Sequence, residues 1–508
     1  MEWAWSFLVC SIIIVLSPAL FILHHRKIST TNRLPPGPPG WPVFGHMFKL
    51  GTMPHKTLAG FKQHYGPVIW LKLGSRNTMV VLTANTAAEL FKNHDLSFME
   101  RTVTSVFQSQ GYDKGALSLA PYGTYWRVLR RICTVEMFVN RKINETVSIR
   151  RKCVNDMLSW IEKEARVVTP EVRAIHVTRF VFLASFNMLG NLMLSRDLVD
   201  PESKEGSEFF TAMIDLIEWT GHPNIVDSFP WLRLLDPQGL RKKMDRDMGK
   251  ALMIASGFVK ERIKERQEGR ESRNKDFLDV LLEFEGSGKD EPAKLSHQEI
   301  NIFILEMFLA GSETTSSSLE WALTELLCNP TSMMKVKDEI ATVIGPNRKL
   351  EEGDIDNLQY LQAVLKETLR LHPPVPLLIP RKAIRETDFM GYQIPKETQV
   401  FVNAWAMGRD PECWDDPLSF KPERFLGSKI DYKGQHFELI PFGAGRRMCV
   451  GVPLAHRMLH LVLGSLLQEF DWELGGDVTP ETMDRKERMG VIVRKLEPLK
   501  AVPKKCVV

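Results

Sequence analysis

One cysteine, Cys449, lies in the glycine- and arginine-rich stretch PFGAGRRMCVG, between Pro441 and Gly451. The seven cysteines of the chain are scattered and form no CxxC pair, which argues against a disulfide framework and a zinc cluster. Two chemistries remain for Cys449: a catalytic nucleophile, which needs a neighbouring general base, or a thiolate ligand to a metal cofactor, which needs none. His456 is the nearest histidine, and no further residue of a catalytic triad accompanies it.

The neighbours of Cys449 favour the metal-ligand interpretation. Arg446 and Arg447 are expected to lower the pKa of the thiol and to pair with carboxylates of a cofactor. A cysteinate axial ligand of haem iron donates electron density to the metal and favours O–O cleavage. Three glycines allow the backbone to approach a flat or bulky group: Gly443, Gly445 and Gly451.

A second group of reactive side chains follows an apolar run, in the stretch AGSETTSSS that begins at Ala310. A buried acid, Glu313, beside a buried alcohol, Thr314, is costly unless the two groups are paired. Gly311 leaves room for a small ligand one turn before Thr314. An acid, an alcohol and a gap together indicate proton delivery to a bound molecule. The alternative is a polar kink, because Ser and Thr bond back to the helix carbonyls.

A third group pairs Glu367 with Arg370 at i and i+3, on one face of a helix. Apolar residues flank this pair on both sides, which predicts that it is buried. A buried ion pair needs further donors, and Arg424 of the KPERF stretch is the candidate third partner.

The elements that position these groups begin with 21 uncharged residues from Trp3 to Leu23. This run is long enough to cross a bilayer as a helix. Four basic residues follow it, so by the positive-inside rule the rest of the chain faces the cytosol. A signal peptide cleaved near Ala19 is the alternative. We therefore expect an anchor at 1–23, a basic flank and proline-rich hinge at 24–45, and a catalytic domain at 46–508.

The body of the chain reads as one large, mainly helical unit with a small β part. The sequence predicts a hairpin over 66–84, helices beyond Pro121, a β-rich segment from Leu377 to Val402 and a short strand after Gly490. Strands and helices do not alternate along the chain, so the sequence does not indicate a parallel sheet. Ser296 and Glu299 form a capping box that opens the helix carrying Glu313. The charged residues 241–275 are expected to form a pair of solvated helix faces. The net charge of +4 over 508 residues does not indicate a nucleic-acid partner.

At this point the motifs resemble those of the cytochrome P450 family of haem-thiolate monooxygenases. Phe442, Gly445, Arg447, Cys449 and Gly451 match every fixed position of its F-x-x-G-x-R-x-C-x-G signature. The remaining motifs match in the expected order: AGSETT from Ala310, E-x-x-R at Glu367 and Arg370, PERF at Pro422 to Phe425, and W-x-x-x-R at Trp126 and Arg130.

The resemblance implies a triangular, mostly helical body with a small β domain, behind an N-terminal transmembrane helix. It implies haem b as the cofactor, with Cys449 as its axial ligand and Thr314 with Glu313 as the proton relay. Glu367, Arg370 and Arg424 become the triad that supports the cysteine loop. The cofactor contacts it implies are Trp126, Arg130, Arg381, Phe442, Arg447 and Gly451.

The layout is similar to that of plant members of the family, which are single-pass proteins of the endoplasmic-reticulum membrane with the catalytic domain facing the cytosol. The resemblance implies that an NADPH-dependent flavoprotein reductase supplies the electrons and that O2 is a substrate. Arg131, Arg141 and Lys142 are expected to form a basic patch for that reductase. The stretches FVFLASFNMLGNLMLS and AGSETTSSSLEWALTELL most resemble the plant group numbered seventy-six, close to its A subfamily.

That group implies a small apolar substrate, a monoterpenoid or an iridoid. An alkaloid or a phenolic substrate is the alternative, and a haem isomerase or dehydratase that needs no oxygen is the rival reaction. Such enzymes typically lose the acid–alcohol pair, which this chain keeps. The candidate substrate contacts share an apolar side chain, which predicts recognition by shape: Phe107, Leu119, Ala120, Ala310, Val375, Ile379 and Val491.

Overall fold

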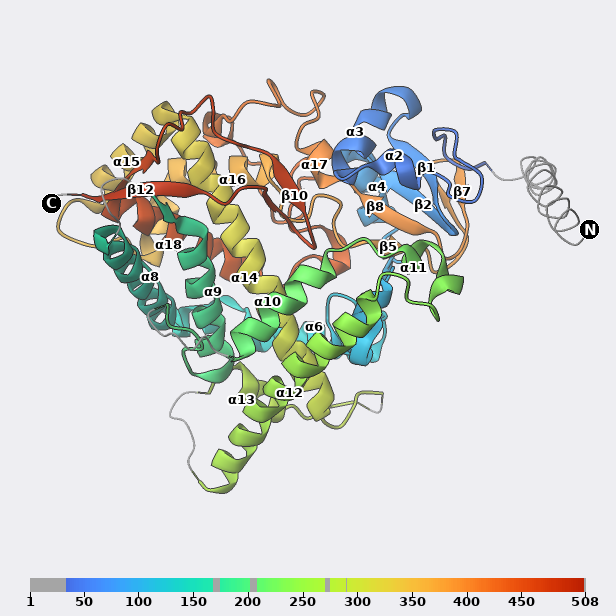
Figure 1. The fold of residues 1–508 in the computed structure, drawn as a ribbon, viewed down its shortest axis with the longest axis horizontal. Helices are drawn as coiled ribbons and strands as arrows, with labels where there is room; N and C mark the ends of the chain where they lie inside the picture. The colour runs from blue at the N-terminus through green and yellow to red at the C-terminus, as the bar shows by residue number, and fades with distance from the viewer. Residues whose placement is uncertain (1–32, 168–173, 202–207, 270–274, 289, 507–508) are drawn as a thin grey trace, which may run out of the picture.

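Helix α14 (His297–Cys328) runs through the middle of the body, with helices on either side of it (Figure 1). The predicted capping box starts it: the Glu299 amide donates to Ser296 Oγ at 3.2 Å, and the Ser296 amide donates to Glu299 Oε2 at 2.7 Å. Nearly every residue from Ile300 onward is buried. Because both faces of α14 are covered, it is the core element on which the others pack. The computed structural model describes residues 33–167, 174–201, 208–269, 275–288 and 290–506. The expected anchor at 1–23 and the flank to residue 32 lie outside them.

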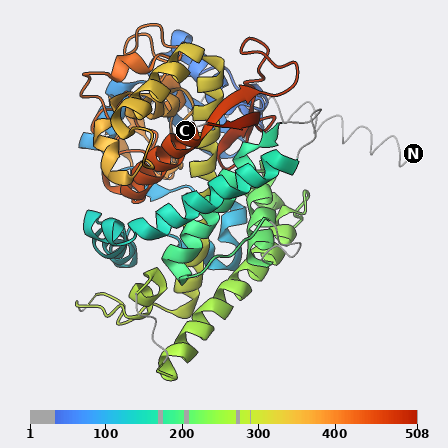
Figure 2. The same ribbon diagram turned by 90° about the vertical axis from the view of Figure 1, so that its left-hand side faces the viewer.

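The helices that pack on α14 include α9 (Val177–Leu194), α12 (Leu240–Gln267), α16 (Gln359–Leu371) and α18 (Val452–Glu469). Helix α8 (Val147–Val167) covers the other side of α9, as Figure 2 also shows. Of the described helices, α9 alone is long and apolar enough to cross a membrane, and 78% of it is buried inside the protein. Its apolar residues therefore belong to the core.

The charged stretch 241–275 was expected to form a pair of solvated helix faces, and only part of its surface is solvated. Residues 240–267 form one continuous helix, α12. Its buried residues include Met244, Met248, Ala251 and Ala255, a spacing of three and four that forms one apolar stripe along the helix. That stripe packs on α10 (Glu208–Thr220) and α14, and most of the charged residues occupy the remaining faces of a single helix. Asp247 and Arg262 are exceptions, because both are buried.

The predicted hairpin is confirmed as β1 (Val68–Leu73) and β2 (Arg76–Val81), which pair antiparallel. The β-rich segment from Leu377 to Val402 is confirmed as well. It supplies β5 (Arg381–Lys382), β6 (Thr387–Phe389), β7 (Tyr392–Ile394) and β8 (Gln399–Val402). One sheet has the order β1-β2-β8-β5-β3, where β3 is Glu100–Arg101. Strands β2 and β8 are parallel in it, which the sequence did not indicate because no single helix connects them.

Two further sheets matter for the site. Strands β10 (Glu487–Met489) and β11 (Val493–Lys495) form a hairpin where the sequence predicted one short strand. Strands β4 (Ile175–His176), β12 (Lys500–Lys505) and β9 (Phe470–Leu474) form a three-stranded sheet that the sequence missed.

The shorter helices complete the described fold. The α-helices are α2 (Met47–Leu50), α3 (Pro54–Tyr65), α4 (Ala84–Asn93), α5 (Tyr112–Gly115), α6 (Thr124–Arg131), α7 (Asn140–Glu145), α11 (Ile225–Ser228), α13 (Phe277–Leu282), α15 (Pro330–Ile344) and α17 (Ala404–Met407). Other helical turns are η1 (Ser105–Gly111), η2 (Ile132–Met137), η3 (Pro230–Leu232), η4 (Glu352–Asn357), η5 (Pro422–Phe425) and η6 (Gly445–Arg447).

Candidate active site

The loop that carries Cys449 joins η6 to the first turn of α18. Gly443 and Gly445 have φ angles of 73° and 71°, a region that glycine enters without strain. A Cβ at Gly445 would also lie 2.8 Å from Oδ1 of Asp95, so the loop needs glycine there for space. The Cys449 amide donates to the Phe442 carbonyl at 3.0 Å. These contacts fix the cysteine directly before the N-terminus of a helix.

Many protein atoms lie close to the thiol of Cys449, but the residue remains accessible to solvent. Burial raises its pKa, and the side chain nevertheless keeps accessible surface. Three groups favour the thiolate against that burial: the amides of Gly451 and Val452 at the start of α18, and the guanidinium of Arg130. Arg130 also donates a hydrogen bond to the Met448 carbonyl.

The sequence had assigned this effect on the thiol to Arg446 and Arg447, and the structure corrects it. Arg446 lies 3.6 Å from Oδ2 of Asp95 and is half exposed. Arg447 donates to the Ala120 carbonyl at 2.6 Å. Both side chains are thus directed to other partners, and Arg130 is the cation that acts on the sulfur.

A cluster of arginines lies beside this loop. Arg381 donates to Asp95 Oδ1 at 2.7 Å and to the Ala444 carbonyl at 3.2 Å. The guanidinium of Arg447 lies 4.9 Å from the centre of the Trp126 ring. Burial, and then repulsion from Arg381 and Arg447, lowers the pKa of Arg101 well below its usual value. Burial likewise lowers the pKa of Arg447 to about 10.

The arginine cluster has more positive than negative charge. Its four guanidiniums (Arg101, Arg130, Arg381 and Arg447) act on one another, and Arg446 lies beside the same Asp95. The carboxylates that act on these arginines are Asp95, Glu100 and Glu306, so the cations outnumber the acids. Moreover, Nε and Nη1 of Arg447 are buried without a hydrogen-bond partner among the described residues. Buried donors of this kind require an acceptor, so the cluster fits an anionic group.

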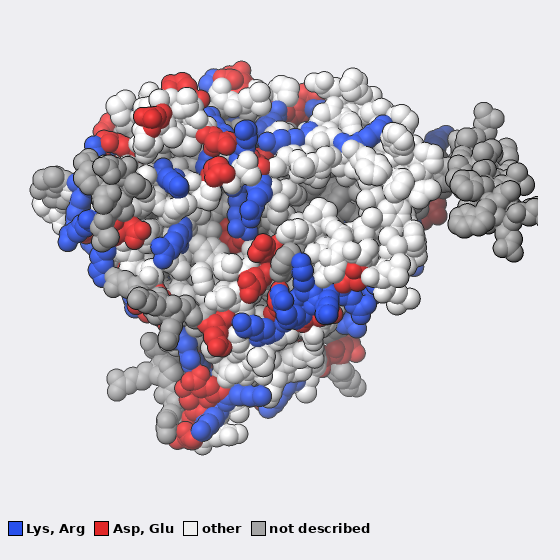
Figure 3. Space-filling model, in the orientation of Figure 1, with Lys and Arg blue, Asp and Glu red and all other residues white. Residues whose placement is uncertain are grey.

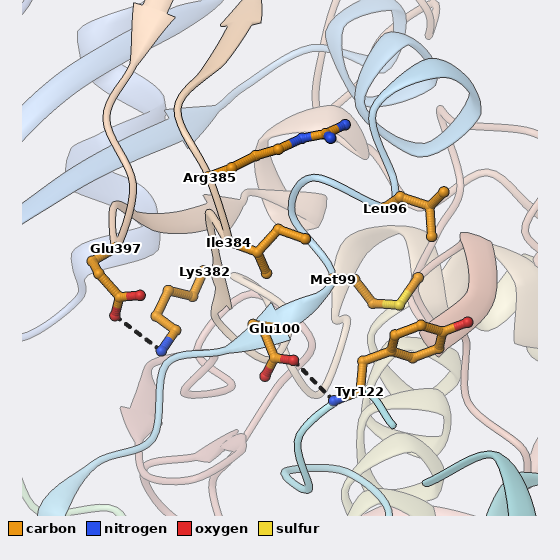
Figure 4. Close-up of a pocket in the computed structure, with 8 residues that line it drawn as sticks. All are labelled: Leu96, Met99, Glu100, Tyr122, Lys382, Ile384, Arg385 and Glu397. Atoms are coloured by element: carbon orange, nitrogen blue, oxygen red, sulfur yellow. Dashed lines mark hydrogen bonds and ion pairs between the residues drawn. The ribbon is translucent and has the colours of Figure 1, made fainter. Parts of the chain in front are cut away.

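The strand pair β3–β5 separates this cluster from the outside. Glu100 faces Lys382 and Arg101 faces Arg381 across the ladder, and successive strand residues point to opposite sides. Glu100 and Lys382 accordingly line a surface groove of about 510 Å³ (Figure 4). Glu100 accepts the Tyr122 amide at 2.9 Å, and Lys382 pairs with Glu397 at 3.0 Å. The arginine cluster therefore occupies the inner face of the ladder.

The structure brings Glu367, Arg370 and Arg424 together. Arg370 donates to both carboxylate oxygens of Glu367 at 2.7 Å, and Arg424 Nε donates to Oε1 at 3.1 Å. Arg370 also donates to the carbonyls of Pro417 at 2.7 Å and Ser419 at 3.1 Å. The pair is fully buried, and it ties α16 to the segment that precedes η5.

Glu313 and Thr314 follow each other on α14 and have different partners. The Thr314 hydroxyl donates to the Ala310 carbonyl at 2.6 Å. Glu313 is buried and forms an ion pair with Arg494 of β11. Burial raises the pKa of the Glu313 carboxyl to about 7, against the opposing effects of Arg494 and Arg488. An acid with this pKa can both release and accept a proton near neutral pH.

The seven apolar candidate contacts are not equivalent in the structure. Ala310 is exposed on α14, and Val375 and Ile379 are half-buried in the segment between α16 and β5. Phe107 stacks on Tyr112 with ring centres 5.7 Å apart. Ala120 has no exposed surface, and its carbonyl accepts the bond from Arg447, so it holds that arginine in place. The other two are Leu119, which is buried, and Val491, which is 41% exposed between β10 and β11.

Comparison with known proteins identifies the family. The family model described as Cytochrome P450 matches residues 35–501. The chain is 63% identical to cytochrome P450 76A2 of Solanum melongena over 507 residues, 99% of this chain and 100% of that protein. It is 54% identical to the iridoid oxidase of Catharanthus roseus, over 96% of this chain and 95% of that protein. The chain belongs to the cytochrome P450 family.

Within this family, the chain falls in the plant group numbered seventy-six. It is 42% identical to the geraniol 8-hydroxylase of Catharanthus roseus, over 93% of this chain and 94% of that protein. As a cytochrome P450 it is a monooxygenase that uses haem iron, O2 and a redox partner. The arginine cluster fits the cofactor, because protoporphyrin carries carboxylates and buried donors of Arg447 lack an acceptor among the described residues.

Three residues of the site were missed by sequence reasoning: Asp95, Arg101 and Arg494. Asp95 contacts both Arg381 and the amide of Arg446 at 3.1 Å, so it joins the β-sheet region to the cysteine loop. None of the three lies in a motif, and their spacing to Cys449 and Glu313 in the sequence carries no signal. They are recognisable only once strands from distant segments pair.

Proposed function

We propose that this cytochrome P450 binds haem b through Cys449 and hydroxylates a small apolar terpenoid, a monoterpenoid or an iridoid. The excess positive charge around Arg447, with the unpartnered Nε and Nη1 atoms, is the observation that supports the cofactor assignment. In this proposal Arg101, Arg381 and Arg447 bind the haem carboxylates, while Arg130 holds the cysteine loop. Trp126, Phe442 and Gly451 contact the ring, and bound haem iron supplies the activation of O2.

The residues of α14 would move protons rather than bind the metal. The bond to the Ala310 carbonyl uses the single proton of the Thr314 hydroxyl and fixes the position of its oxygen. That oxygen can accept a hydrogen bond from a molecule bound next to the exposed Ala310, and it donates to that molecule when the bond to Ala310 is exchanged. Glu313, with a pKa of about 7, can resupply the proton. Glu367, Arg370 and Arg424 are assigned to support of the fold, because they are buried and bound to backbone carbonyls.

The substrate class rests on the relatives and on the apolar character of the candidate contacts. Proteins named iridoid oxidase and geraniol 8-hydroxylase are 54% and 42% identical over nearly the whole chain. Both names refer to small, largely apolar terpenoids. The exposed or half-buried candidates Ala310, Val375 and Ile379 offer no polar side chain, so shape rather than hydrogen bonding would orient the substrate.

A direct test supplies the purified protein with a reductase, NADPH and a panel of geraniol-like alcohols, iridoids, alkaloids and phenols. We expect NADPH-dependent O2 uptake and a hydroxylated product with a terpenoid. Turnover confined to an alkaloid or a phenol would overturn the substrate class. Product without any O2 uptake would instead indicate an isomerase or a dehydratase.

We also propose a single-pass anchor in the endoplasmic-reticulum membrane with the catalytic body in the cytosol. An exposed apolar surface supports this. Phe44 lies 5.8 Å from Phe229 (ring centres), which brings the segment around α2 next to the segment after α11. Charged side chains are sparse over this part of the molecule (Figure 3). Its exposed members, here called the apolar patch, are Trp41, Val43, Phe44, Phe48, Trp231, Leu234 and Leu235.

The electron donor we propose is a membrane-bound, NADPH-dependent flavoprotein reductase. The expected basic patch for it needs revision. Arg131 pairs with Glu291 at 2.7 Å, and Lys142 and Arg141 lie 2.9 Å and 3.9 Å from Glu145. Two acids thus offset most of the charge of the three cations, so this patch alone offers little attraction to an acidic partner.

A further inference from the structure

We propose that Arg494 is a positioning residue for proton delivery, and that protons reach Glu313 from solvent along the β10–β11 hairpin that carries Arg494. The inference rests on the proposed role of Glu313. It goes beyond that role by naming the group that holds the acid and the side of the protein from which the acid is resupplied.

The hairpin holds Arg494 in a fixed place against α14. Ser317 lies one turn after Glu313, on the same face of the helix, and its hydroxyl donates to the Val493 carbonyl at 2.9 Å. The Val493 amide donates to the Pro374 carbonyl at 2.8 Å. Because the backbone of Val493 is bound on both sides, the point from which the Arg494 side chain extends is fixed next to α14. The ion pair with Glu313 then selects the rotamer of that side chain.

The ion pair joins the protein interior to the solvent. The Glu313 side chain is 5% exposed, whereas the Arg494 side chain is 35% exposed. The carboxylate therefore has one buried side, towards α14, and one side at which a partly hydrated guanidinium reaches water. After Glu313 releases its proton towards Thr314, Arg494 stabilises the carboxylate until a proton from the buffered solvent, passed on through water at that side, restores the acid. The cycle leaves Glu313 unchanged.

Among the described residues, two cations act on the carboxyl of Glu313: Arg494 of β11 and Arg488 of β10. These two arginines are cross-strand partners in the hairpin. Both lower the pKa of Glu313, which burial raises, and Arg494 has the larger effect of the two. Since an adjacent cation favours the ionised acid, loss of Arg494 leaves Glu313 protonated to higher pH.

The hairpin also contacts the end of α10. A Cβ at Gly221 would lie 2.6 Å from Cα of Gly490 and 2.7 Å from the amide nitrogen of Val491. Val491, at the tip, is a candidate substrate contact. The β10–β11 hairpin therefore carries both Arg494 and a candidate substrate contact, so a substrate bound at its tip would contact the same hairpin that positions Arg494 at Glu313.

The test titrates Glu313 directly in the full-length holoenzyme. The infrared band of its protonated carboxyl, assigned by its loss in Glu313→Gln, is followed against pH. We expect Arg494→Gln to raise the midpoint by about one pH unit or more, and Arg494→Lys to restore most of it. Arg488→Gln is the matched control, because it removes the same charge from the paired strand, and a smaller rise is expected. No rise in Arg494→Gln, or an equal rise in Arg488→Gln, would overturn the proposal.

The same variants are then compared by product formed per NADPH consumed across pH. Proton supply from Glu313 declines as pH rises through its pKa, so in Arg494→Gln the decline should move to higher pH, in step with the infrared midpoint. An infrared shift with an unmoved coupling profile would overturn the role of Arg494. If Glu313→Gln leaves the product formed per NADPH unchanged, Glu313 is not part of the proton relay and the proposed function fails at that step. The infrared titration reports the Glu313–Arg494 ion pair separately, so the two failures can be told apart.

Discussion

Cys449 is the residue on which the cofactor assignment can be tested most simply. Serine offers no thiolate, so Cys449→Ser should lose the thiolate-type carbon-monoxide spectrum of the reduced protein. Cys413→Ser is the control, because Cys413 is also exposed but lies outside the loop. An unaltered spectrum in Cys449→Ser would contradict the axial-ligand assignment.

Thr314 can be separated from the general effect of a hydroxyl in the helix. Thr314→Ala should still bind haem and consume NADPH, but release several-fold more hydrogen peroxide per product, because the proton donor is lost. Thr324→Ala is the matched control: its hydroxyl makes the same bond to the carbonyl four residues earlier, at 2.7 Å, on the same helix. Equal peroxide release from both variants would mean that Thr314 only shapes α14.

Among single residues, the sequence indicated those that lie in short motifs and missed those that come to the site from distant segments of the chain. Cys449, Glu313 and Glu367 were proposed because their neighbours along the chain are unusual. The arginine cluster depends instead on the register of β3 against β5, which places Arg101 opposite Arg381. The partner of the Cys449 thiol was misassigned for the same reason: adjacency in sequence does not fix where a long arginine side chain points.

Among the elements, α16 carries the buried pair of Glu367 and Arg370, and Arg424 of η5 is joined to it through Glu367. Removing one partner of a buried ion pair leaves the other charge uncompensated, at a cost of about 3–5 kcal/mol. Glu367→Gln should therefore lower the melting temperature and the haem content of the purified protein. Arg348→Ala, which breaks the exposed pair with Asp354, should change both much less. Comparable losses in the two variants would show that burial is not the cause.

Elements with strong local signals were predictable, and those that depend on long-range pairing were not. The β1–β2 hairpin has β-rich runs around a tight turn, and α14 has a capping box and an apolar run. The β4-β12-β9 sheet joins residues near 175 to the C-terminal segment, and β4 contributes only two residues to it. Such a strand is too short to show a periodicity.

For the whole molecule, the apolar patch predicts a second membrane contact besides the anchor. A chain lacking residues 1–23 should keep partial association with phospholipid vesicles in a flotation assay. Replacing Trp231, Leu234 and Leu235 by serine in that chain should abolish the association, because it removes exposed apolar area at one place. Met334→Ser with Leu418→Ser removes two exposed apolar side chains elsewhere, 59% and 74% exposed, and should have little effect. Retention of binding by the triple variant would exclude the patch as a membrane contact.

The parallel pairing of β2 with β8 has a consequence for how the protein is made. Met79 lies opposite Val400, so the strand next to β2 leaves the ribosome only after most of the chain has been synthesised. Until then the β1–β2 hairpin exposes an edge that can pair with other chains. Strand β5, which carries Arg381, pairs with β8 in the same sheet. Assembly of the haem pocket is therefore expected to be a late, post-translational event, and nascent chains that stall before residue 399 would be substrates for chaperones.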